Sequence, residues 1–434
     1  MSALLQRSRS LGTDKRVTNY GGGNTSAKAP ALDPVSGEPR ETLYIKGSGG
    51  DLGTLTSDGV AALDLGRIRL LKDRYRGEAF EDEMVELLEH CRLGGAAPSI
   101  DTAMHGLIDE AHIDHLHPDA VIALAAAVDG ESLTKECYGD DVAWVRWRRP
   151  GFELALEIEA LHHDEPGLRG VVLGGHGLTT WGATSEDCER TSFELIARAE
   201  EFIARKGRPD PFGRVVPAFA PLDPEHRRRA AAELAPVIRG LCGTDRPVVG
   251  AFDESDVVLD FLAHEAAARL VPLGTSCPDH FIRTKVRPLL LDLPPTAPLA
   301  ERVERLGQLH AEYRDEYAAY YQRHAQPDSP AMRGADPAVV LVPGVGMFSF
   351  GADAGTARLA GEFYVNAINV MRGAEALSTY DPVPEGEKFR IEYWALEEAK
   401  LQRRPRPKAL TGRVALVTGA GSGIGRAITE RLAA

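Results

Sequence analysis

Hydrophobic and polar residues follow two different periodicities in the first half of the chain, and together they predict a mixed α/β domain. Three runs in which apolar residues alternate or follow one another without a break indicate strands, at 41–46, 120–128 and 170–181. Between the first two runs, residues 81–93 carry apolar side chains at spacings of three and four, which predicts an amphipathic helix. We therefore expect strands and helices to follow one another within one domain.

A proline-rich stretch separates this half from a second α/β pattern. Residues 208–224 contain five prolines and little periodicity, which places a domain boundary near 210–225. Beyond it we expect strands at 247–252, 257–262 and 338–343, a charged helix at 299–324, and further helices at 361–372 and 389–402. The predicted domains are residues 1–220 and 221–402, and no internal repeat is evident in the sequence.

The end of the chain changes character twice. Residues 403–411 are basic and rich in proline, which at the overall charge of this chain favours a linker over a nucleic-acid patch. In residues 412–434 an apolar run, a glycine turn and a helical stretch follow one another, the order with which a dinucleotide-binding fold begins. The predicted fold class is thus α/β throughout: one large domain, a middle segment, and the first strand-turn-helix of a Rossmann domain.

Composition excludes several classes of protein. The 434 residues carry 64 acidic against 50 basic side chains, a formal net charge of −14, whereas general binding of nucleic acid needs a dense basic surface. No apolar run reaches the roughly 18 residues that span a bilayer, and the N-terminal stretch lacks a hydrophobic leader. The five cysteines are widely spaced and form no CxxC pair, which favours reduced thiols and a cytoplasmic location.

Three of the thirteen histidines suggest a metal site. In a strand, His115 and His117 would point to the same face, because side chains repeat every two residues. His176 follows a buried strand within the glycine turn 174–177, where the backbone can approach an ion closely. Three neutral imidazoles that leave one position open are what a catalytic divalent ion such as zinc requires. The spacing alone also fits surface or hydrogen-bonded histidines, so both interpretations stay open here.

Further blocks around these histidines carry a family resemblance. In chain order they are Gly23-Asn24-Thr25-Ser26, Lys46-Gly47-Ser48-Gly49, Pro98-Ser99-Ile100-Asp101, the two-histidine run, and the segment from His176 to Gly182. Over about residues 15–205 their order and spacing resemble the class II aldolase and adducin superfamily. The resemblance implies metal-dependent chemistry on a small phosphorylated sugar, with His115, His117 and His176 as the metal ligands.

The resemblance also assigns roles to the other blocks. Glycine turns with short polar side chains can hold a phosphate without a lysine cluster, and the positions that match the family's phosphate contacts are Asn24, Ser26, Ser48, Gly49 and Ser99. Asp101 aligns with a glutamate that acts as acid or base beside the metal in the aldolases. An aspartate reaches about 1.5 Å less far. It also resembles the sugar-phosphate 4-epimerases, in which this residue ligates the metal, and a simple helix cap is a third possibility.

Two later regions extend the resemblance over nearly the whole chain. Residues 418–425 resemble the short-chain dehydrogenase signature, in which Gly419, Gly423 and Gly425 would contact NAD(P). The remaining strands and catalytic residues of such a domain are missing, so we expect a fragment without dehydrogenase activity and NAD(P) only in a full-length relative. The runs 275–281, 344–348 and 361–366 resemble the bifunctional rhamnulose-1-phosphate aldolase/alcohol dehydrogenase family. Within the first run, Cys277 and His280 mimic a catalytic pair, although we expect a structural role.

The implied reaction is retro-aldol cleavage of L-rhamnulose 1-phosphate to dihydroxyacetone phosphate and L-lactaldehyde by a class II, metal-dependent lyase. A homo-oligomer is expected, because the family places active sites at subunit interfaces. A sugar-phosphate 4-epimerase and a dehydratase would use the same metal, and both stay open as alternatives. A non-catalytic, adducin-like module lacks metal histidines, so the presence of all three here argues against it.

Overall fold

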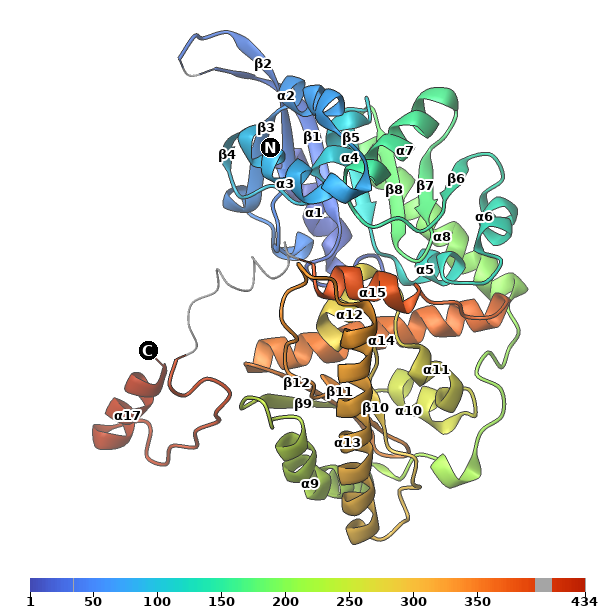
Figure 1. Cartoon of the computed structure of the whole chain (residues 1–434), viewed down its shortest axis with the longest axis vertical. Coiled ribbons are helices and arrows are strands. Elements are labelled where there is room, and N and C mark those ends of the chain that lie inside the picture. The colour runs from blue at the N-terminus through green and yellow to red at the C-terminus, as the bar shows by residue number, and fades with distance from the viewer. Residues whose placement is uncertain (34, 395–407, 434) are drawn as a thin grey trace.

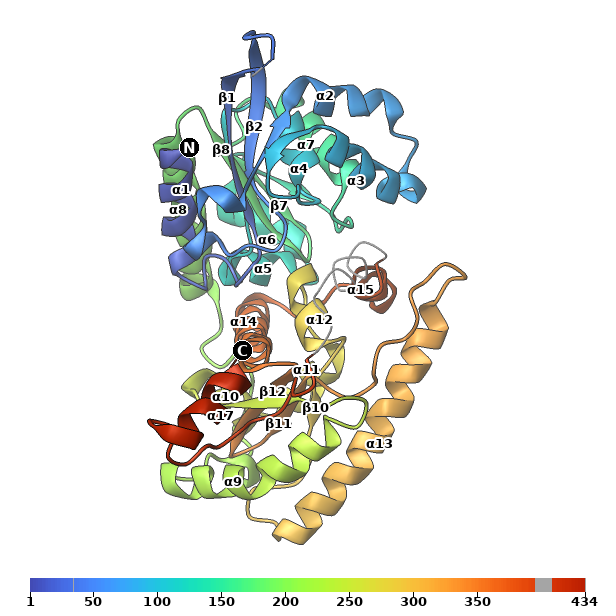
Figure 2. The ribbon, with the colours of Figure 1, turned by 90° about the vertical axis from the view of Figure 1, so that its left-hand side faces the viewer.

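The computed structural model describes residues 1–33, 35–394 and 408–433. Two α/β domains lie end to end, the first coloured blue to green in the upper half of Figure 1 and the second green to red below it. Helices α12, α14 and α15 lie where the two domains meet, in both views (Figures 1 and 2). Among the described helices, none is long and apolar enough to cross a bilayer.

An eight-stranded sheet forms the centre of the first domain, in the order β4-β3-β2-β1-β5-β8-β7-β6. Every neighbouring pair is antiparallel except β6 and β7. Its strands are β1 Asn24–Leu32, β2 Pro39–Lys46, β3 Val60–Asp64, β4 Arg92–Gly95, β5 His112–Leu116, β6 Val142–Val145, β7 Gly170–Leu173 and β8 Gly177–Gly182.

Helices cover both faces of this sheet and give it two separate cores (Figure 2). One face packs against α1 Ser2–Thr13, α5 Asp119–Ala125, α6 Gly130–Tyr138 and α8 Ser185–Lys206. The other packs against α2 Leu65–Leu70, α3 Glu81–His90, α4 Thr102–Leu107 and α7 Phe152–Asp164.

The second domain is built on a four-stranded sheet in the order β10-β11-β12-β9. Its strands are β9 Val249–Asp253, β10 Leu289–Leu290, β11 Val339–Val342 and β12 Gly346–Gly351. Its helices are α9 Pro224–Leu241, α10 Asp256–Ala263, α11 Ala267–Leu273, α12 Pro278–Thr284, α13 Leu299–His324, α14 Ala354–Leu377 and α15 Glu385–Glu392.

The second sheet repeats half of the first, which corrects the expectation that the chain has no internal repeat. The order β9-β12-β11-β10 matches β5-β8-β7-β6, with the same strand directions, and a helix pair follows the first strand in both. The register agrees as well, since Gly182 lies opposite His112 and Gly351 opposite Val249. The repeat is not evident in the sequence because it preserves backbone features, such as turn glycines and helix caps. Few residues at equivalent positions of the two sheets are identical.

Two predicted strands are helices, and they occupy equivalent places in this repeat. Residues 120–128 fall largely within α5, and residues 257–262 fall within α10. Every residue of α5 is buried or nearly so, because α8 and α14 pack against it on different sides. A short helix without an exposed face leaves no 3.6-residue periodicity, so its apolar run looks like a buried strand.

The C-terminal region bears out only part of its prediction. Helix α17, Gly423–Ala433, follows the glycine turn as expected. The described residues 412–422 form no strand, and Val414 and Leu416 are 74% and 94% exposed. A strand needs a partner for its backbone groups, and no described strand lies beside this run. The predicted linker residues 403–407 and helix residues 395–402 lie outside the described residues, and the Rossmann opening stays a prediction.

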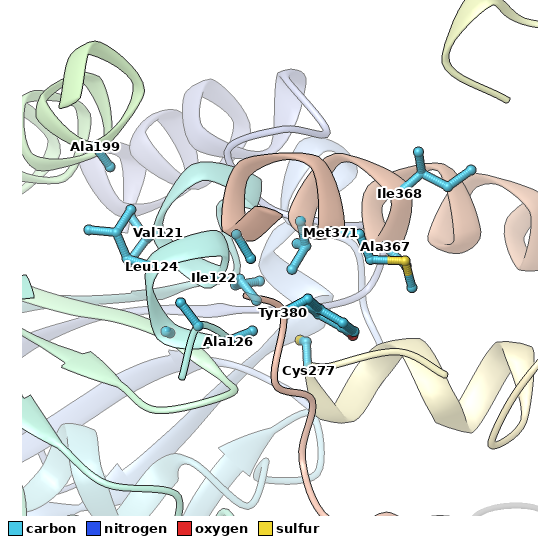
Figure 3. Close-up of a cluster of buried hydrophobic side chains, with 14 of the residues drawn as sticks. Val121, Ile122, Leu124, Ala126, Ala199, Cys277, Ala367, Ile368, Met371 and Tyr380 are labelled. Atoms are coloured by element: carbon cyan, nitrogen blue, oxygen red, sulfur yellow. The ribbon is translucent and has the colours of Figure 1, made fainter. Parts of the chain in front are cut away.

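A continuous hydrophobic cluster joins the two domains where α5 meets α14 (Figure 3). Ile122 of α5 faces Met371 of α14, and Tyr380 and Cys277 close the cluster below them. At the edge of this contact, Asn366 and Asn369 of α14 donate to the Asp119 carboxylate at 2.9 and 2.8 Å. The packing and these amide contacts fix the second domain against the first.

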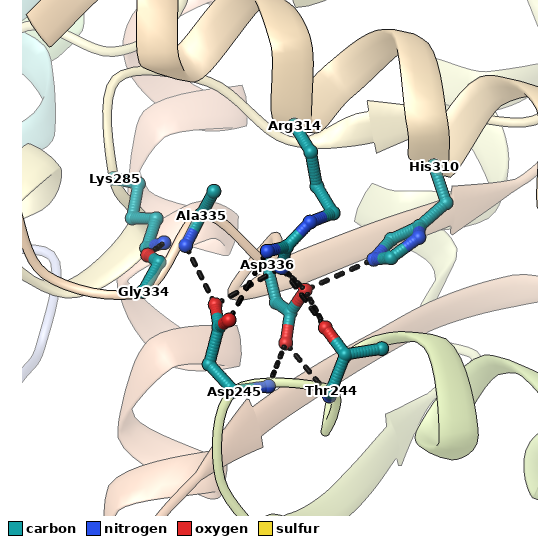
Figure 4. Close-up of polar contacts among 8 residues, drawn as sticks. All are labelled: Thr244, Asp245, Lys285, His310, Arg314, Gly334, Ala335 and Asp336. Atoms are coloured by element: carbon teal, nitrogen blue, oxygen red, sulfur yellow. Dashed lines mark hydrogen bonds and ion pairs between the residues drawn. The ribbon is translucent and has the colours of Figure 1, made fainter.

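Asp336 organises a polar cluster inside the second domain (Figure 4). Its carboxylate accepts hydrogen bonds from the backbone amides of Thr244 and Asp245, at 2.8 and 3.1 Å. His310 and Arg314 of α13 contact the same carboxylate. The cluster ties α13 to the loop that leads into β9, and so stiffens the frame of the second sheet.

A buried ion pair anchors α1 to the strand that carries His115. Arg7 Nε lies 2.9 Å from Asp114 Oδ1, and both side chains are at most 1% exposed. The same guanidinium donates to Ser185 Oγ of α8 and to the Ser26 carbonyl of β1, at 2.8 and 2.6 Å. Removal of one partner from such a pair is costly, since it leaves a buried charge without compensation.

We predict that Arg7→Leu lowers the free energy of unfolding by about 3–5 kcal/mol. Arg16→Leu serves as the control, because Arg16 pairs with Asp14 at 2.7 Å while its side chain is 66% exposed. That change should cost less than about 1 kcal/mol. Urea unfolding followed by circular dichroism measures both, and equal losses in the two variants would contradict the prediction.

Candidate metal centre

The three predicted histidines meet at one edge of the first sheet. His115 is on β5, His117 follows two residues later, and His176 is in the turn between β7 and β8. Because β8 pairs with both β5 and β7, the turn returns His176 to the end of β5. The Nε2 atom of His115 lies 3.1 Å from that of His117 and 3.3 Å from that of His176.

The geometry of these imidazoles, and the protonation of two of them, fit a divalent metal. A tetrahedral ion at about 2.0–2.1 Å from each nitrogen separates its ligand atoms by about 3.3 Å, close to the distances between these Nε2 atoms. All three side chains are buried. Burial, together with the charge of His117, lowers the pKa of His176 to about 3, and burial also lowers the pKa of His115. Both are therefore neutral at physiological pH, which is the form that ligates metals.

The Nδ1 atom of each imidazole faces away from the cluster of Nε2 atoms, and neighbouring side chains contact two of these three Nδ1 atoms. Thr179 Oγ1 of β8 lies 3.0 Å from His115 Nδ1. Asp279 Oδ2, from α12 in the second domain, lies 2.8 Å from His117 Nδ1. Burial lowers the pKa of His117, but the nearby Cys277 and Asp279 outweigh it and raise that pKa above its usual value. The second domain thus favours positive charge at this corner of the site.

Asp101 lies in the same pocket but outside the cluster of imidazole nitrogens. It directly precedes α4, and Asn24 Nδ2 of β1 donates a hydrogen bond to its Oδ2 at 2.5 Å. The ligand atoms of the three histidines all lie within 4.8 Å of one another, and Asp101 does not belong to that group.

A cavity of about 100 Å³ opens over the histidines and Asp101. It is lined by the glycine turn 21–23 and by four of the five predicted phosphate contacts, Asn24, Ser48, Gly49 and Ser99. The fifth, Ser26, is not among the lining residues: it is fully buried, and its hydroxyl lies 2.8 Å from His105 Nδ1. Ser26 is two residues further along β1 than Asn24, which carries it away from the pocket.

Lys46, at the end of β2, stands in one of the blocks that carry the resemblance, where the sequence left open a phosphate neighbour or a surface charge. It is buried and lines the cavity beside the glycine turn. The lining residues that the sequence did not assign to the site belong to the second domain, namely Pro278, Asp279, Ile282, Ile391 and Trp394. The signal available for them was the run 275–281, in which Asp279 contacts His117 Nδ1 and Cys277 lies close to the same histidine. His280 instead lies buried against Phe363, with ring centroids 5.9 Å apart.

The glycines predicted to contact NAD(P) lie elsewhere. Gly419, Gly423 and Gly425 lie around the start of α17. Figure 1 shows this helix beside the second domain and away from the region where the two domains meet. They do not line the cavity at the histidines. No nucleotide-binding role for them follows from this structure, and it stays a prediction.

Comparison with known families agrees with this geometry. Residues 2–202 match the class II aldolase and adducin N-terminal domain, and residues 229–401 match the second domain of class II aldolases. The chain contains domains of the class II aldolase and adducin superfamily. Class II aldolases use a divalent metal, and the histidine cluster in the first of these domains is a potential site for one.

Individual relatives of these aldolase-type domains differ in how much they share with the chain. An uncharacterized oxidoreductase, YuxG, from Bacillus subtilis (strain 168) is 36% identical over 436 residues, which is 99% of this chain but 62% of that protein. The chain thus spans less than two thirds of the relative's length. A class II aldolase domain from Thermoplasma acidophilum is 28% identical, with a TM-score of 0.43 over 46% of this chain and 92% of its own.

Another solved structure, the L-fuculose-1-phosphate aldolase from Thermus thermophilus, is 16% identical. The match covers 47% of this chain and 94% of that one, with a TM-score of 0.31.

We predict that His176→Ala weakens the binding of Zn²⁺ by more than about 100-fold, because it removes one of three nitrogens rather than a supporting contact. Competition with a chromophoric chelator measures the affinity. His310→Ala is the control, since His310 is also buried but belongs to the Asp336 cluster. A control variant that loses as much zinc affinity as His176→Ala would argue against the assignment.

Proposed function

We propose that this chain is a metal-dependent lyase that cleaves L-rhamnulose 1-phosphate to dihydroxyacetone phosphate and L-lactaldehyde. The observation that carries the proposal is the convergence of three buried imidazoles and Asp101 on one cavity rimmed by glycine turns. The superfamily membership supports aldolase or epimerase chemistry on a sugar phosphate. The particular sugar rests on the resemblance of the run 275–281 and its neighbours to the bifunctional aldolases.

In this proposal, the substrate phosphate binds at the glycine turns that line the cavity together with the histidines. The backbone around Gly22 and Gly49 and the side chains of Ser48 and Ser99 offer hydrogen-bond donors, and Lys46 supplies positive charge. A phosphate held there leaves the sugar carbons above His115, His117 and His176. Substrates that lack the phosphate should therefore react slowly, because they lose the contacts that hold the reacting carbons in place.

His115, His117 and His176 would hold a divalent ion, proposed to be zinc, which supplies stabilisation of the negative charge that develops on substrate oxygens. Asp101 takes the proton from the hydroxyl next to the bond that breaks, and returns it to the carbon left behind. The hydrogen bond from Asn24 orients the carboxylate for this transfer. This contact fixes the direction of the shorter aspartate side chain.

The position of Asp101 favours the aldolase over the epimerase alternative. In the epimerases that the sequence resembles, the corresponding aspartate ligates the metal. Here the carboxylate of Asp101 is held by Asn24 and lies outside the group of ligand atoms formed by the three histidines. Product analysis separates the two reactions, because an epimerase returns a sugar phosphate of the same length.

We predict that Asp101→Asn lowers kcat for cleavage of L-rhamnulose 1-phosphate by about 10²–10⁴-fold, the usual contribution of a general acid or base. Zinc affinity should stay within a few-fold of the wild type, because Asp101 is not one of the three ligands. Release of dihydroxyacetone phosphate is followed with a coupled dehydrogenase. Asp109→Asn serves as the control, since Asp109 is an exposed residue that pairs with Arg69.

Two outcomes would overturn the proposal. One is the absence of dihydroxyacetone phosphate from the zinc-loaded wild-type protein. The other is full activity in Asp101→Asn.

A further inference from the structure

Helix α12 brings a segment of the second domain directly onto the metal centre. The amide of Cys277, at the start of α12, donates to the carbonyl of Gly175 at 3.0 Å, and Gly175 belongs to the turn that carries His176. Cys277 and Lys285, at the two ends of α12, are the non-glycine residues with positive φ in the described chain, at 74° and 61°. Such conformations cost about 1–3 kcal/mol each and persist where the surrounding structure enforces them.

The packing of α12 against this turn places one carboxylate of the second domain against one imidazole of the first. Asp279 Oδ2 lies 2.8 Å from His117 Nδ1, the separation of an ion pair between a carboxylate and an imidazolium. Both atoms are buried and neither makes an aligned hydrogen bond to any described residue, while Cys277 lies close to the same imidazole. Gly22 packs over the contact so closely that a Cβ there would lie 2.3 Å from Asp279 Oδ2 and 2.8 Å from His117 Nδ1.

We propose that Asp279, from the second domain, is a positioning residue that orients His117 of the first domain for metal binding. This inference rests on the proposed metal-dependent function. The opposite nitrogen, His117 Nε2, faces His115 Nε2 at 3.1 Å. A carboxylate at Nδ1 holds the proton on that side, leaves Nε2 as the lone-pair donor, and increases its basicity. The first domain thus supplies the nitrogens, and the second domain sets the orientation of one of them.

The internal repeat explains why the second domain has this role in place of a metal site of its own. By the register of the two sheets, the positions of His115, His117 and His176 correspond to Phe252, Glu254 and Val345. A phenyl ring and an isopropyl group offer no metal ligand. Glu254 is engaged in ion pairs with Arg227 and Arg228. What the second domain contributes to metal binding is Asp279, which lies outside the repeated strands.

The test compares Asp279→Asn with Asp256→Asn. Both residues are acidic and lie in the first turn of a short helix of the second domain, but Asp256 is exposed at the start of α10. Zinc affinity is measured by chelator competition, and the ligand field by visible absorption of the Co²⁺-loaded protein. We expect Asp279→Asn to weaken zinc binding by about 10–100-fold and to alter the Co²⁺ spectrum. Asp256→Asn should change neither, and identical affinities and spectra in the two variants would overturn the inference.

A second variant approaches the same contact from the first domain. Gly22→Ala places a methyl group against Asn19, Asp279 and His117, whereas Gly50→Ala adds one where no atom lies within 4 Å. The inference requires weaker zinc binding in Gly22→Ala alone, even if Asp279→Asn fails to fold. The proposed function fails separately: a wild-type protein that binds no zinc contradicts it. A wild-type protein that binds zinc and cleaves substrate, with both test variants unaffected, contradicts only the role of Asp279.

Discussion

The register between β5 and β8 is the constraint on which the rest of the site depends. His115 lies opposite Thr179, whose hydroxyl contacts its outward nitrogen. Gly177 lets β8 start against the end of β5, since a Cβ there would lie 2.4 Å from the Leu116 carbonyl. A slip of one residue would turn every side chain of β8 to the other face and carry His176 away from His115. The docking of α12 follows from the same register, because its backbone anchor is the carbonyl of Gly175.

The features of the site that the sequence predicts are local ones. His115 and His117 are two residues apart at the end of a strand, and His176 lies in a glycine turn, so short-range periodicity brings them into view. Asp279 could not be found in this way, because its place depends on how two domains pack. Ser26 was misplaced for a related reason: the motif that contains it is local, but only the length of β1 decides which of its residues reaches the pocket.

The fold shows the same division between local and distant determinants. The long amphipathic helix α13 begins and ends where its pattern predicts, because one of its faces remains in solvent. Helices α5 and α10 were both mistaken for strands, since burial on all sides removes the periodic signal. Their equivalent positions in the two sheets also explain why the repeat is not evident in the sequence. The order and register of the strands are kept, while the residues at equivalent positions differ; buried Val345, for example, stands at the position of His176.

The hydrogen bond between Cys277 and Gly175 has an energetic consequence beyond geometry. It joins the loop that carries His176 to the helix that carries Asp279, so under the proposed metal binding the ion and the closeness of the two domains would depend on shared contacts. Two equilibria that share contacts are linked, and each shifts the other by the same free energy. On that proposal, whatever pulls the domains apart would loosen the ion, and a bound ion would in turn resist their separation.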